Sequence, residues 1–262
     1  MSDAFRLDGK VVVLTGAAGI IGSEVTRNFL AAGARVFAID RDAAVLGEKL
    51  GPPTDTLVHC VADVSSPESL GPARAMLESK WGGADALLNN AATKSVNFFE
   101  PFETFPLADW NEVMNVNLTG AMLCAQAFGA GMAQRGRGSI VNTLSIYGIV
   151  APDQRIYEGS QYEGRAINTP AIYSASKAGL WGLTKYLASY WGAKGVRVNA
   201  ITPGGVFSGQ NDTFVANYSS RAPLGRMAQA DDMANAMRFL VSDASKYMTG
   251  HNLVVDGGWT AW

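Results

Sequence analysis

Cysteine, histidine and charged residues are all scarce in this sequence. The chain has two cysteines, Cys60 and Cys124, in separate segments, and two histidines, His59 and His251. Neither pair has the spacing of a metal site or the partners of a hydrolytic triad. We therefore expect two buried thiols in a reducing compartment, no metal ion and no catalytic histidine.

Long apolar runs and an excess of basic residues are also missing. No apolar run reaches the roughly 18 residues of a membrane span, and the N-terminal segment lacks the apolar stretch of a signal peptide. The formal net charge is -2 and the isoelectric point is about 5.7, so no basic surface is available for a phosphate backbone. We expect a cytoplasmic protein that binds neither membranes nor nucleic acid.

The composition is that of a globular protein, with 48% hydrophobic and 17% charged residues. Short apolar runs alternate with segments of helical period, and no repeat or linker divides the chain. The strands are predicted at 10–16, 35–40, 56–63, 84–92, 138–145, 196–204 and 252–258. The helices are predicted at 23–34, 69–81, 107–134, 172–192 and 230–241.

This alternation predicts the fold class. Continuous apolar strands separated by helices indicate a parallel sheet that is covered on both faces. Right-handed crossovers then give a single α/β domain over 1–262, with a Rossmann-type doubly wound sheet of about seven strands. In such folds the ligand crevice lies at the carboxyl ends of the strands.

Three glycines follow the first predicted strand, in the stretch TGAAGIIGSEV. Gly16, Gly19 and Gly22 would let backbone N–H groups approach a pyrophosphate at a helix N-terminus. Asp40 ends the second predicted strand, 18 positions after Gly22 (40 − 22), where a carboxylate accepts hydrogen bonds from ribose hydroxyls. Asp63, at the end of the third strand, could hold the adenine. A dinucleotide site is therefore predicted at this edge.

Asp40 also bears on which dinucleotide binds. A carboxylate repels the 2′-phosphate of NADP by up to roughly 4 kcal/mol per charge pair at ~4 Å in an effective dielectric near 20. Arg41 follows directly and would offset part of this repulsion. We expect NAD to be preferred, with NADP as the less favoured alternative.

The stretch YSASK puts Tyr173 and Lys177 one helical turn apart. Such a pair can be a surface contact worth a few tenths of a kcal/mol. It can also be a functional pair, because a cation within ~4–6 Å stabilises a phenolate whose ordinary pKa is about 10. The spacing alone leaves both interpretations open.

Taken together, the motifs resemble those of the short-chain dehydrogenase/reductase family in its compact form, over essentially the whole chain. They are Thr15–Gly22, Asp63, Asn89–Ala91, Asn117, Ser145, Tyr173 with Lys177, Pro203–Gly204 and Asp256–Gly258. The resemblance implies an NAD-dependent oxidoreductase that interconverts a secondary alcohol and a ketone on a small polar substrate, such as a sugar derivative.

The resemblance also implies roles for individual residues. Tyr173 would be the general acid/base, and Lys177 would bind the nicotinamide ribose and lower the pKa of Tyr173. Ser145 would hydrogen-bond the substrate oxygen, and Asn117 would hold a water that links Lys177 to solvent. The expected cofactor contacts are Gly16, Gly19, Ile20, Ile21, Gly22, Asp40, Arg41, Asp63, Val64, Asn90, Ala91, Ala92, Tyr173, Lys177, Pro203, Gly204, Val206 and Ser208.

Two departures from the family pattern affect the interpretation. Ile20 stands where the middle glycine is usual, and Ala92 replaces the glycine usual after Asn-Asn-Ala. The resulting Gly-x-x-Gly-x-x-Gly spacing resembles the extended branch of the family, which includes epimerases and dehydratases. An NAD-using epimerase or dehydratase is therefore an alternative, and a catalytically silent nucleotide-sensing scaffold is another.

The distance between Ser145 and Tyr173 is also unusual, at 28 positions (173 − 145), about twice that common in the family. We expect residues 146–172 to border the substrate pocket, because both ends of this insertion are tied to predicted catalytic residues. Its polar side chains Gln154, Arg155 and Glu158 are the candidates for substrate contact. An oligomer contact or a solvated loop is the alternative.

Two looser expectations complete the prediction. The insertion and the C-terminal segment resemble those of sugar-modifying members associated with flagellin glycosylation, which suggests a carbohydrate-like substrate. Family members commonly form tetramers through two helices, here 107–134 and 172–192, which are rich in Ala, Gly and Leu. Their outer faces would otherwise expose apolar surface, so we expect a homotetramer.

Overall fold

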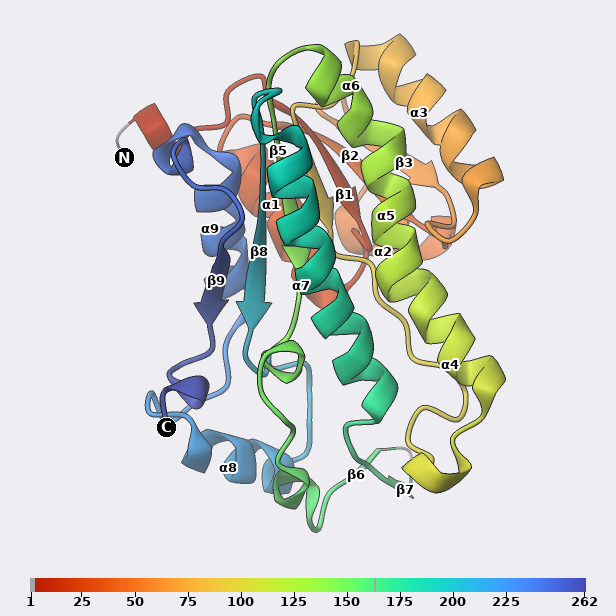
Figure 1. Ribbon diagram of the computed structural model, residues 1–262, viewed down its shortest axis with the longest axis vertical. Coiled ribbons are helices and arrows are strands. Elements are labelled where there is room, and N and C mark those ends of the chain that lie inside the picture. The colour runs from red at the N-terminus through yellow and green to blue at the C-terminus, as the bar shows by residue number, and fades with distance from the viewer. Residues whose placement is uncertain (1–2, 163) are drawn as a thin grey trace.

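The computed structural model describes residues 3–162 and 164–262. A seven-stranded sheet runs through its centre in the order β3-β2-β1-β4-β5-β8-β9, with every neighbouring pair parallel (Figure 1). This confirms the predicted doubly wound sheet. The strands are β1 Val11–Thr15, β2 Arg35–Asp40, β3 Leu57–Val61, β4 Ala86–Asn89, β5 Gly138–Thr143, β8 Val196–Pro203 and β9 Asn252–Val255.

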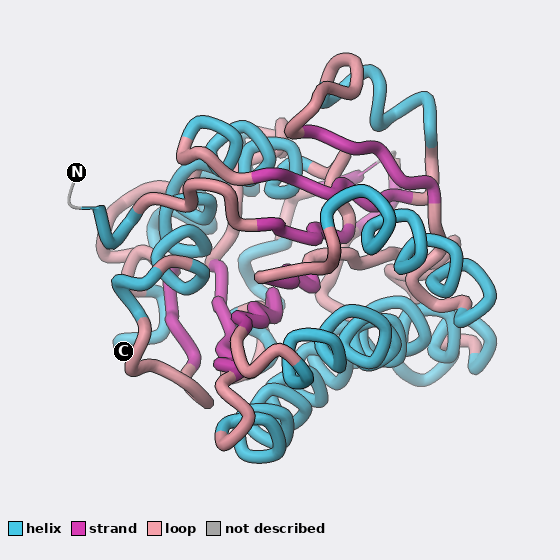
Figure 2. The backbone as a smooth tube through the Cα atoms, turned by 90° about the horizontal axis from the view of Figure 1, so that it is seen from above, coloured by secondary structure: helices cyan, strands magenta, loops and turns pink. Residues whose placement is uncertain are grey.

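Helices cover both faces of this sheet (Figures 1 and 2). One face carries α1 Ile20–Ala31, α2 Ala43–Leu50 and α9 Ala230–Val241. The other carries α3 Pro67–Trp81, α7 Ala171–Gly192 and a long helical run. That run comprises α4 Leu107–Met114, α5 Gly120–Cys124 and α6 Ala130–Gln134, joined by π-helical turns at Asn115–Thr119 and Ala125–Gly129. None of the helices in the described part of the chain is long and apolar enough to cross a membrane.

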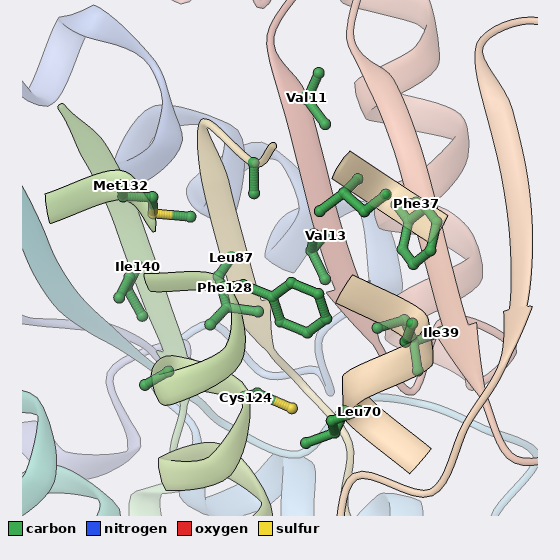
Figure 3. Packing of buried hydrophobic residues seen from close by; sticks show 14 of the residues in the cluster. Val11, Val13, Phe37, Ile39, Leu70, Leu87, Cys124, Phe128, Met132 and Ile140 are labelled. Carbon is green, nitrogen blue, oxygen red and sulfur yellow. The ribbon is translucent and has the colours of Figure 1, made fainter. Parts of the chain in front are cut away.

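The two layers of core follow from the period of the strands. Val11 and Val13 pack on the face of α3, α5 and α7, whereas Val12 and Leu14 pack on the face of α1 and α9. Successive side chains of a strand point to opposite faces, so a strand that is buried on both must be apolar throughout. Figure 3 shows the first layer, with Phe128 beside Leu87 and Val13. Both cysteines are free and buried, as predicted.

A buried polar chain ties α7 to the sheet. Asn89 on β4 donates from Nδ2 to Asn142 Oδ1 at 2.9 Å, and Asn142 on β5 donates to Thr184 Oγ1 on α7 at 2.9 Å. Buried hydrogen bonds of this kind favour one arrangement, because any shift leaves a polar group unpaired. The middle of α7, at Thr184, is therefore held at a fixed position relative to β4 and β5.

The sequence analysis did not predict α2, α8 Asp212–Arg221, or the hairpin formed by β6 Gln161–Tyr162 and β7 Arg165–Ala166. The hairpin and α8 lie beyond the carboxyl ends of the strands, with the start of α7 (Figure 1). This is the edge at which a doubly wound sheet binds its ligand.

Candidate active site

A cavity of 1140 Å³ opens at the carboxyl edge of the sheet. It extends from the turn after β1 to the first turn of α7, and all but one of the predicted cofactor contacts line it. The exception is Gly22, which is buried in the first turn of α1. A Cβ atom there would lie 2.1 Å from the Gly16 carbonyl oxygen, so Gly22 is needed to pack the turn.

The turn after β1 is joined closely to the end of β4. The Thr15 hydroxyl accepts hydrogen bonds from the N–H groups of Asn90 and Ala91, each at 3.1 Å. Asn90 Nδ2 donates in return to the Gly16 carbonyl at 3.2 Å. Gly16 has a φ of 63°, and a Cβ on it would lie 2.9 Å from the Ala91 Cα. The two strand ends thus form one floor, which a larger residue at position 16 would break.

The N-terminus of α1 opens onto this floor. Gly19 occupies the N-cap and provides no side-chain hydrogen bond to the first turn. The N–H groups of a helix N-terminus that lacks such a cap are suited to bind an anion. Ile20, which replaces the usual glycine, is the first residue of α1 and is 52% exposed, so its side chain does not fill the turn.

Asp40 ends β2 beside this turn. Its Oδ2 accepts from Ala18 N at 3.0 Å and its Oδ1 accepts from Arg41 N at 2.8 Å. Each carboxylate oxygen can accept a further hydrogen bond. The uncapped helix N-terminus and a carboxylate fixed next to it therefore fit the pyrophosphate and the ribose of a nicotinamide dinucleotide.

Tyr173 and Ser145 lie at the other end of the cavity. Ser145 follows β5, and its hydroxyl accepts a hydrogen bond from Tyr147 N at 3.3 Å. Burial raises the pKa of Tyr173 above its ordinary value, and a hydrogen bond with Ser145 acts in the opposite direction. The net shift is upward, whereas the sequence analysis expected Lys177 to lower this pKa. Burial of the phenol is the largest cause of the upward shift.

Lys177 is almost completely buried, with 3% of its surface exposed. Its Nζ donates to the Thr143 carbonyl at 2.7 Å and lies 5.9 Å from the centre of the Tyr173 ring. Burial lowers the pKa of Lys177 to about 8. An ammonium held in such surroundings gains from any hydrogen-bond acceptor that reaches it.

Asn117 lies in the first π-helical turn and does not line the cavity. Its Oδ1 accepts from Thr93 N at 3.0 Å, and its Nδ2 donates to Ser176 Oγ at 3.2 Å. Ser176 in turn donates to the Tyr173 carbonyl at 2.9 Å. Both ends of the Asn117 amide thus position the loop after β4 and the start of α7. The expected role of Asn117 in holding a water stays a prediction.

The insertion does border the cavity, but through residues other than those predicted. Gln154, Arg155 and Glu158 are exposed and do not line it. Gln154 pairs with the backbone N–H and carbonyl of Thr169 at 3.1 and 2.8 Å, and Arg155 forms an ion pair with Asp153. The lining residues from the insertion are instead Ile146, Tyr147, Tyr157, Gln161, Tyr162, Ile167, Asn168, Thr169 and Pro170.

Helix α8 holds the insertion from outside. The Asp153 carboxylate accepts from Arg221, and Asn217 Nδ2 donates to the carbonyls of Ile156 and Glu158, each at 3.2 Å. The ring of Phe214 stacks on Tyr157 with centroids 5.5 Å apart. The insertion and α8 therefore form one wall of the cavity.

Comparison with known proteins gives consistent matches over almost the full chain. A family profile described as short chain dehydrogenase matches residues 10–218. A D-threitol dehydrogenase of Mycolicibacterium smegmatis is 35% identical, over 98% of this chain and 95% of its own length. A galactitol 2-dehydrogenase (L-tagatose-forming) of Cereibacter sphaeroides is 36% identical, over 98% of both chains.

Two solved structures are also similar. A short chain dehydrogenase from Leptospira borgpetersenii with bound NAD+ superposes with a TM-score of 0.86 and 34% identity, covering 99% of this chain and 96% of that one. A gluconate 5-dehydrogenase from Burkholderia cenocepacia, in complex with NADP and tartrate, gives a TM-score of 0.85 and 31% identity, covering 99% and 98%.

Proposed function

Because this chain belongs to the short-chain dehydrogenase/reductase family, we propose that it is an NAD(P)-dependent oxidoreductase that interconverts a secondary alcohol and a ketone. The observation that carries the proposal is a single cavity with a dinucleotide-type turn at one end and Ser145, Tyr173 and Lys177 at the other. The proposed substrate is a polyol or a related sugar derivative. The preferred cofactor is NAD.

The residues of the cavity have different roles in such a reaction. The bound dinucleotide would accept or supply the hydride. Tyr173 exchanges a proton with the substrate oxygen, and Ser145 hydrogen-bonds the same oxygen. Lys177 binds the ribose hydroxyls through its Nζ, which is already directed by the Thr143 carbonyl. Such positioned acid/base groups contribute about 10²–10⁴-fold to rate.

The raised pKa of Tyr173 predicts how the rates of alcohol oxidation and ketone reduction depend on pH. Alcohol oxidation needs the phenolate, and a phenol whose pKa exceeds its usual value of about 10 is mostly protonated at neutral pH. Oxidation should therefore become faster as pH rises, and ketone reduction should become slower.

The substrate class is supported by two independent features. Two relatives with more than 95% coverage of this chain are named for sugar alcohols, D-threitol and galactitol. The substrate end of the cavity carries hydroxyl and amide groups, among them Tyr157, Thr169 and Asn168, beside apolar side chains such as Ile167 and Met227. A cavity lined in this way suits a substrate with several hydroxyls.

The test is an assay of NADH formation at 340 nm (the NADH band) with threitol, galactitol and other polyols. Net NADH production separates the dehydrogenase from an epimerase or dehydratase, which regenerates its cofactor, and from a silent scaffold. Tyr173→Phe should lower turnover about 10²–10⁴-fold while NAD binding, followed by fluorescence titration, is kept. More than a tenth of wild-type turnover in this variant would remove Tyr173 from the mechanism.

A further inference from the structure

Tyr147 has a buried hydroxyl with no hydrogen-bond partner of good geometry among the described residues. The residue is 8% exposed, lines the cavity, and follows Ser145 by two positions. Its Oη is buried, and no donor or acceptor in the described part of the chain meets hydrogen-bonding geometry with it. The phenol of Tyr157 lies nearby, and a weak hydrogen-bond interaction between the two hydroxyls contributes to the pKa of each. The pair nevertheless falls outside hydrogen-bonding geometry, and the Tyr157 hydroxyl is paired with Thr169 Oγ1.

Asn168 presents a second group of this kind. Its Nδ2 donates to the Phe99 carbonyl at 2.7 Å. Because a carbonyl can only accept, the group that faces it must be the NH2 of the Asn168 amide. Asn168 Oδ1 therefore points away from Phe99. Asn168 Oδ1 is buried and has no hydrogen-bond partner among the described residues. Asn168 also lines the cavity.

Both groups belong to the substrate end of the cavity. The phenols of Tyr147 and Tyr173 are close enough to interact electrostatically, and both side chains belong to the apolar cluster around Ile156 and Tyr218. The loop that Asn168 holds through Phe99 also carries Phe98, whose ring packs edge-on against Tyr173 at 6.3 Å. The dinucleotide turn lies at the other end of the cavity.

Buried polar atoms without partners are costly, so native proteins rarely keep them unless a ligand or water satisfies them. Tyr147 Oη can both donate and accept, whereas Asn168 Oδ1 can only accept. A ligand that satisfies Asn168 must therefore donate a hydrogen bond. A hydroxyl group can do so, and a carboxylate or a ketone oxygen cannot.

We propose that Tyr147 and Asn168 bind hydroxyl groups of the substrate other than the one that reacts, and that they thereby restrict the enzyme to polyols. The inference rests on the proposed dehydrogenase function and deepens it. These two residues act on substrate choice, while the hydride and proton steps remain with the cofactor and Tyr173.

The first experiment compares two alcohols that differ by one hydroxyl, 2-butanol and 2,3-butanediol, with threitol as a longer polyol. Wild-type kcat/KM should be at least about tenfold higher for the diol, because a site built to bond a hydroxyl discriminates strongly against an analogue that lacks it. Tyr147→Phe should lower kcat/KM for the diol about threefold to tenfold, the usual loss for one uncharged hydrogen bond. The ratio of kcat/KM for the diol to that for 2-butanol should therefore fall by the same factor.

Asn168→Leu should act in the same way. This change also removes the hydrogen bond to Phe99, but loss of that contact alone would affect both alcohols equally. The ratio of the two kcat/KM values therefore isolates hydroxyl recognition. Tyr247→Phe is the matched control, since Tyr247 is fully exposed and does not line the cavity, and it should change neither value.

A second measurement does not depend on activity. Loss of a hydroxyl that has no partner should leave the Tm of Tyr147→Phe equal to that of the wild type or higher. A fall of more than about 3 °C, the effect of one lost buried hydrogen bond in a protein of this size, would mean that the hydroxyl has a structural partner and would overturn the proposal.

The remaining outcomes are also decisive. Equal wild-type activity on 2-butanol and 2,3-butanediol would overturn the role of Tyr147 and Asn168 and leave the dehydrogenase function standing. An equal loss on both alcohols in Tyr147→Phe would also overturn it, because it would assign the hydroxyl to the common chemistry. Absence of activity on every alcohol, including threitol and galactitol, would overturn the proposed function and this inference together.

Discussion

Lys177 combines two properties that oppose each other. It is buried, which lowers its pKa to about 8, and among the described residues its Nζ donates a hydrogen bond to one carbonyl, that of Thr143. A charged group in such a place destabilises the folded protein unless it is well paired. We infer that the residue is kept for its contact with a ligand rather than for stability.

Lys177→Met should therefore stabilise the ligand-free protein at pH 7, by about 1–3 kcal/mol. The folded pKa lies below the value of 10.5 expected without burial, so between about pH 8 and pH 10.5 the unfolded state binds more protons. The free energy of unfolding of the wild type thus rises with pH across this window. The free energy of unfolding of the variant lacks this rise, so the difference in stability between the variant and the wild type should shrink towards pH 10.

Urea unfolding at pH 7 and pH 10 measures this difference. Lys185→Met, on an exposed lysine of the same helix, is the control and should change stability little at either pH. A Lys177→Met protein less stable than the wild type at pH 7 would contradict the argument.

Asp40 should decide between the two cofactors. Asp40→Ser removes the carboxylate that would repel a 2′-phosphate and leaves Arg41, which lines the same part of the cavity. The ratio of kcat/KM for NADP to that for NAD should rise by about one to two orders of magnitude, within the limit set by a repulsion of up to roughly 4 kcal/mol. If the wild-type enzyme already prefers NADP, this interpretation of Asp40 is wrong.

At the scale of secondary structure, the seven central strands could be predicted because their apolar pattern is strong. The same holds for the helical segments that form α1, α3, the run from α4 to α6, α7 and α9. The dinucleotide turn and the Tyr173–Lys177 pair could be placed because polar residues at strand ends must meet at one edge. Helix α8 could not, since its sequence DTFVANYSSR is largely polar and its start depends on Asn211, whose side chain accepts from Phe214 N at 2.9 Å.

The orientation of side chains in the insertion also could not be predicted from the sequence. Gln154 and Arg155 are polar and looked suited to a substrate, yet Thr169 and Asp153 bind them on the outside. The cavity is lined instead by Tyr157, Asn168 and other residues whose roles depend on contacts far along the chain. Local composition carries no signal for such contacts.

The connection between α8 and the insertion gives a prediction for this pair of elements. Asp153 bonds both Arg155 and Arg221, and hydrogen bonds from Arg155, with the charges of both arginines, lower its pKa to about 2. Asp153→Ala should loosen the wall and raise the polyol KM about twofold to fivefold, the range for a partly exposed ion pair. The Kd for NAD should not change.

Steady-state kinetics and NAD titration of Asp153→Ala measure these two quantities. Asp243→Ala, which removes the partner of Lys10 away from the cavity, is the control. An altered NAD affinity in Asp153→Ala would mean that the wall also shapes the dinucleotide site.

At the scale of the whole molecule, α7 carries apolar surface that no other element in the described part of the chain covers. Tyr186 and Tyr190 are 62% and 56% exposed, and their rings stack with centroids 5.7 Å apart. Two large aromatic side chains are rarely left together in water unless they meet a partner. This supports the expectation that α7 and the run from α4 to α6 pair with a second copy of the chain.

Light scattering should give a tetramer of about 111 kDa (4 × 27.7) at micromolar concentration. Tyr190→Glu should shift the mass towards a dimer or a monomer, because it places a charge in the apolar contact. Tyr247→Glu, at the fully exposed Tyr247, should not. A monomeric wild-type protein would contradict the prediction.

The division of the cavity into a floor and a wall has an evolutionary consequence. The floor, with Thr15, Gly16 and Asn90, is built from strand ends that also support the core. A substitution there must therefore preserve both the packing of the strands and the dinucleotide site. The wall, residues 146–172 with α8, is joined by hydrogen bonds and ion pairs between its own residues, and none of these bonds involves a strand of the sheet. Substitutions in the wall can therefore accumulate while the floor stays the same, so descendants of this protein can change substrate without giving up their dinucleotide.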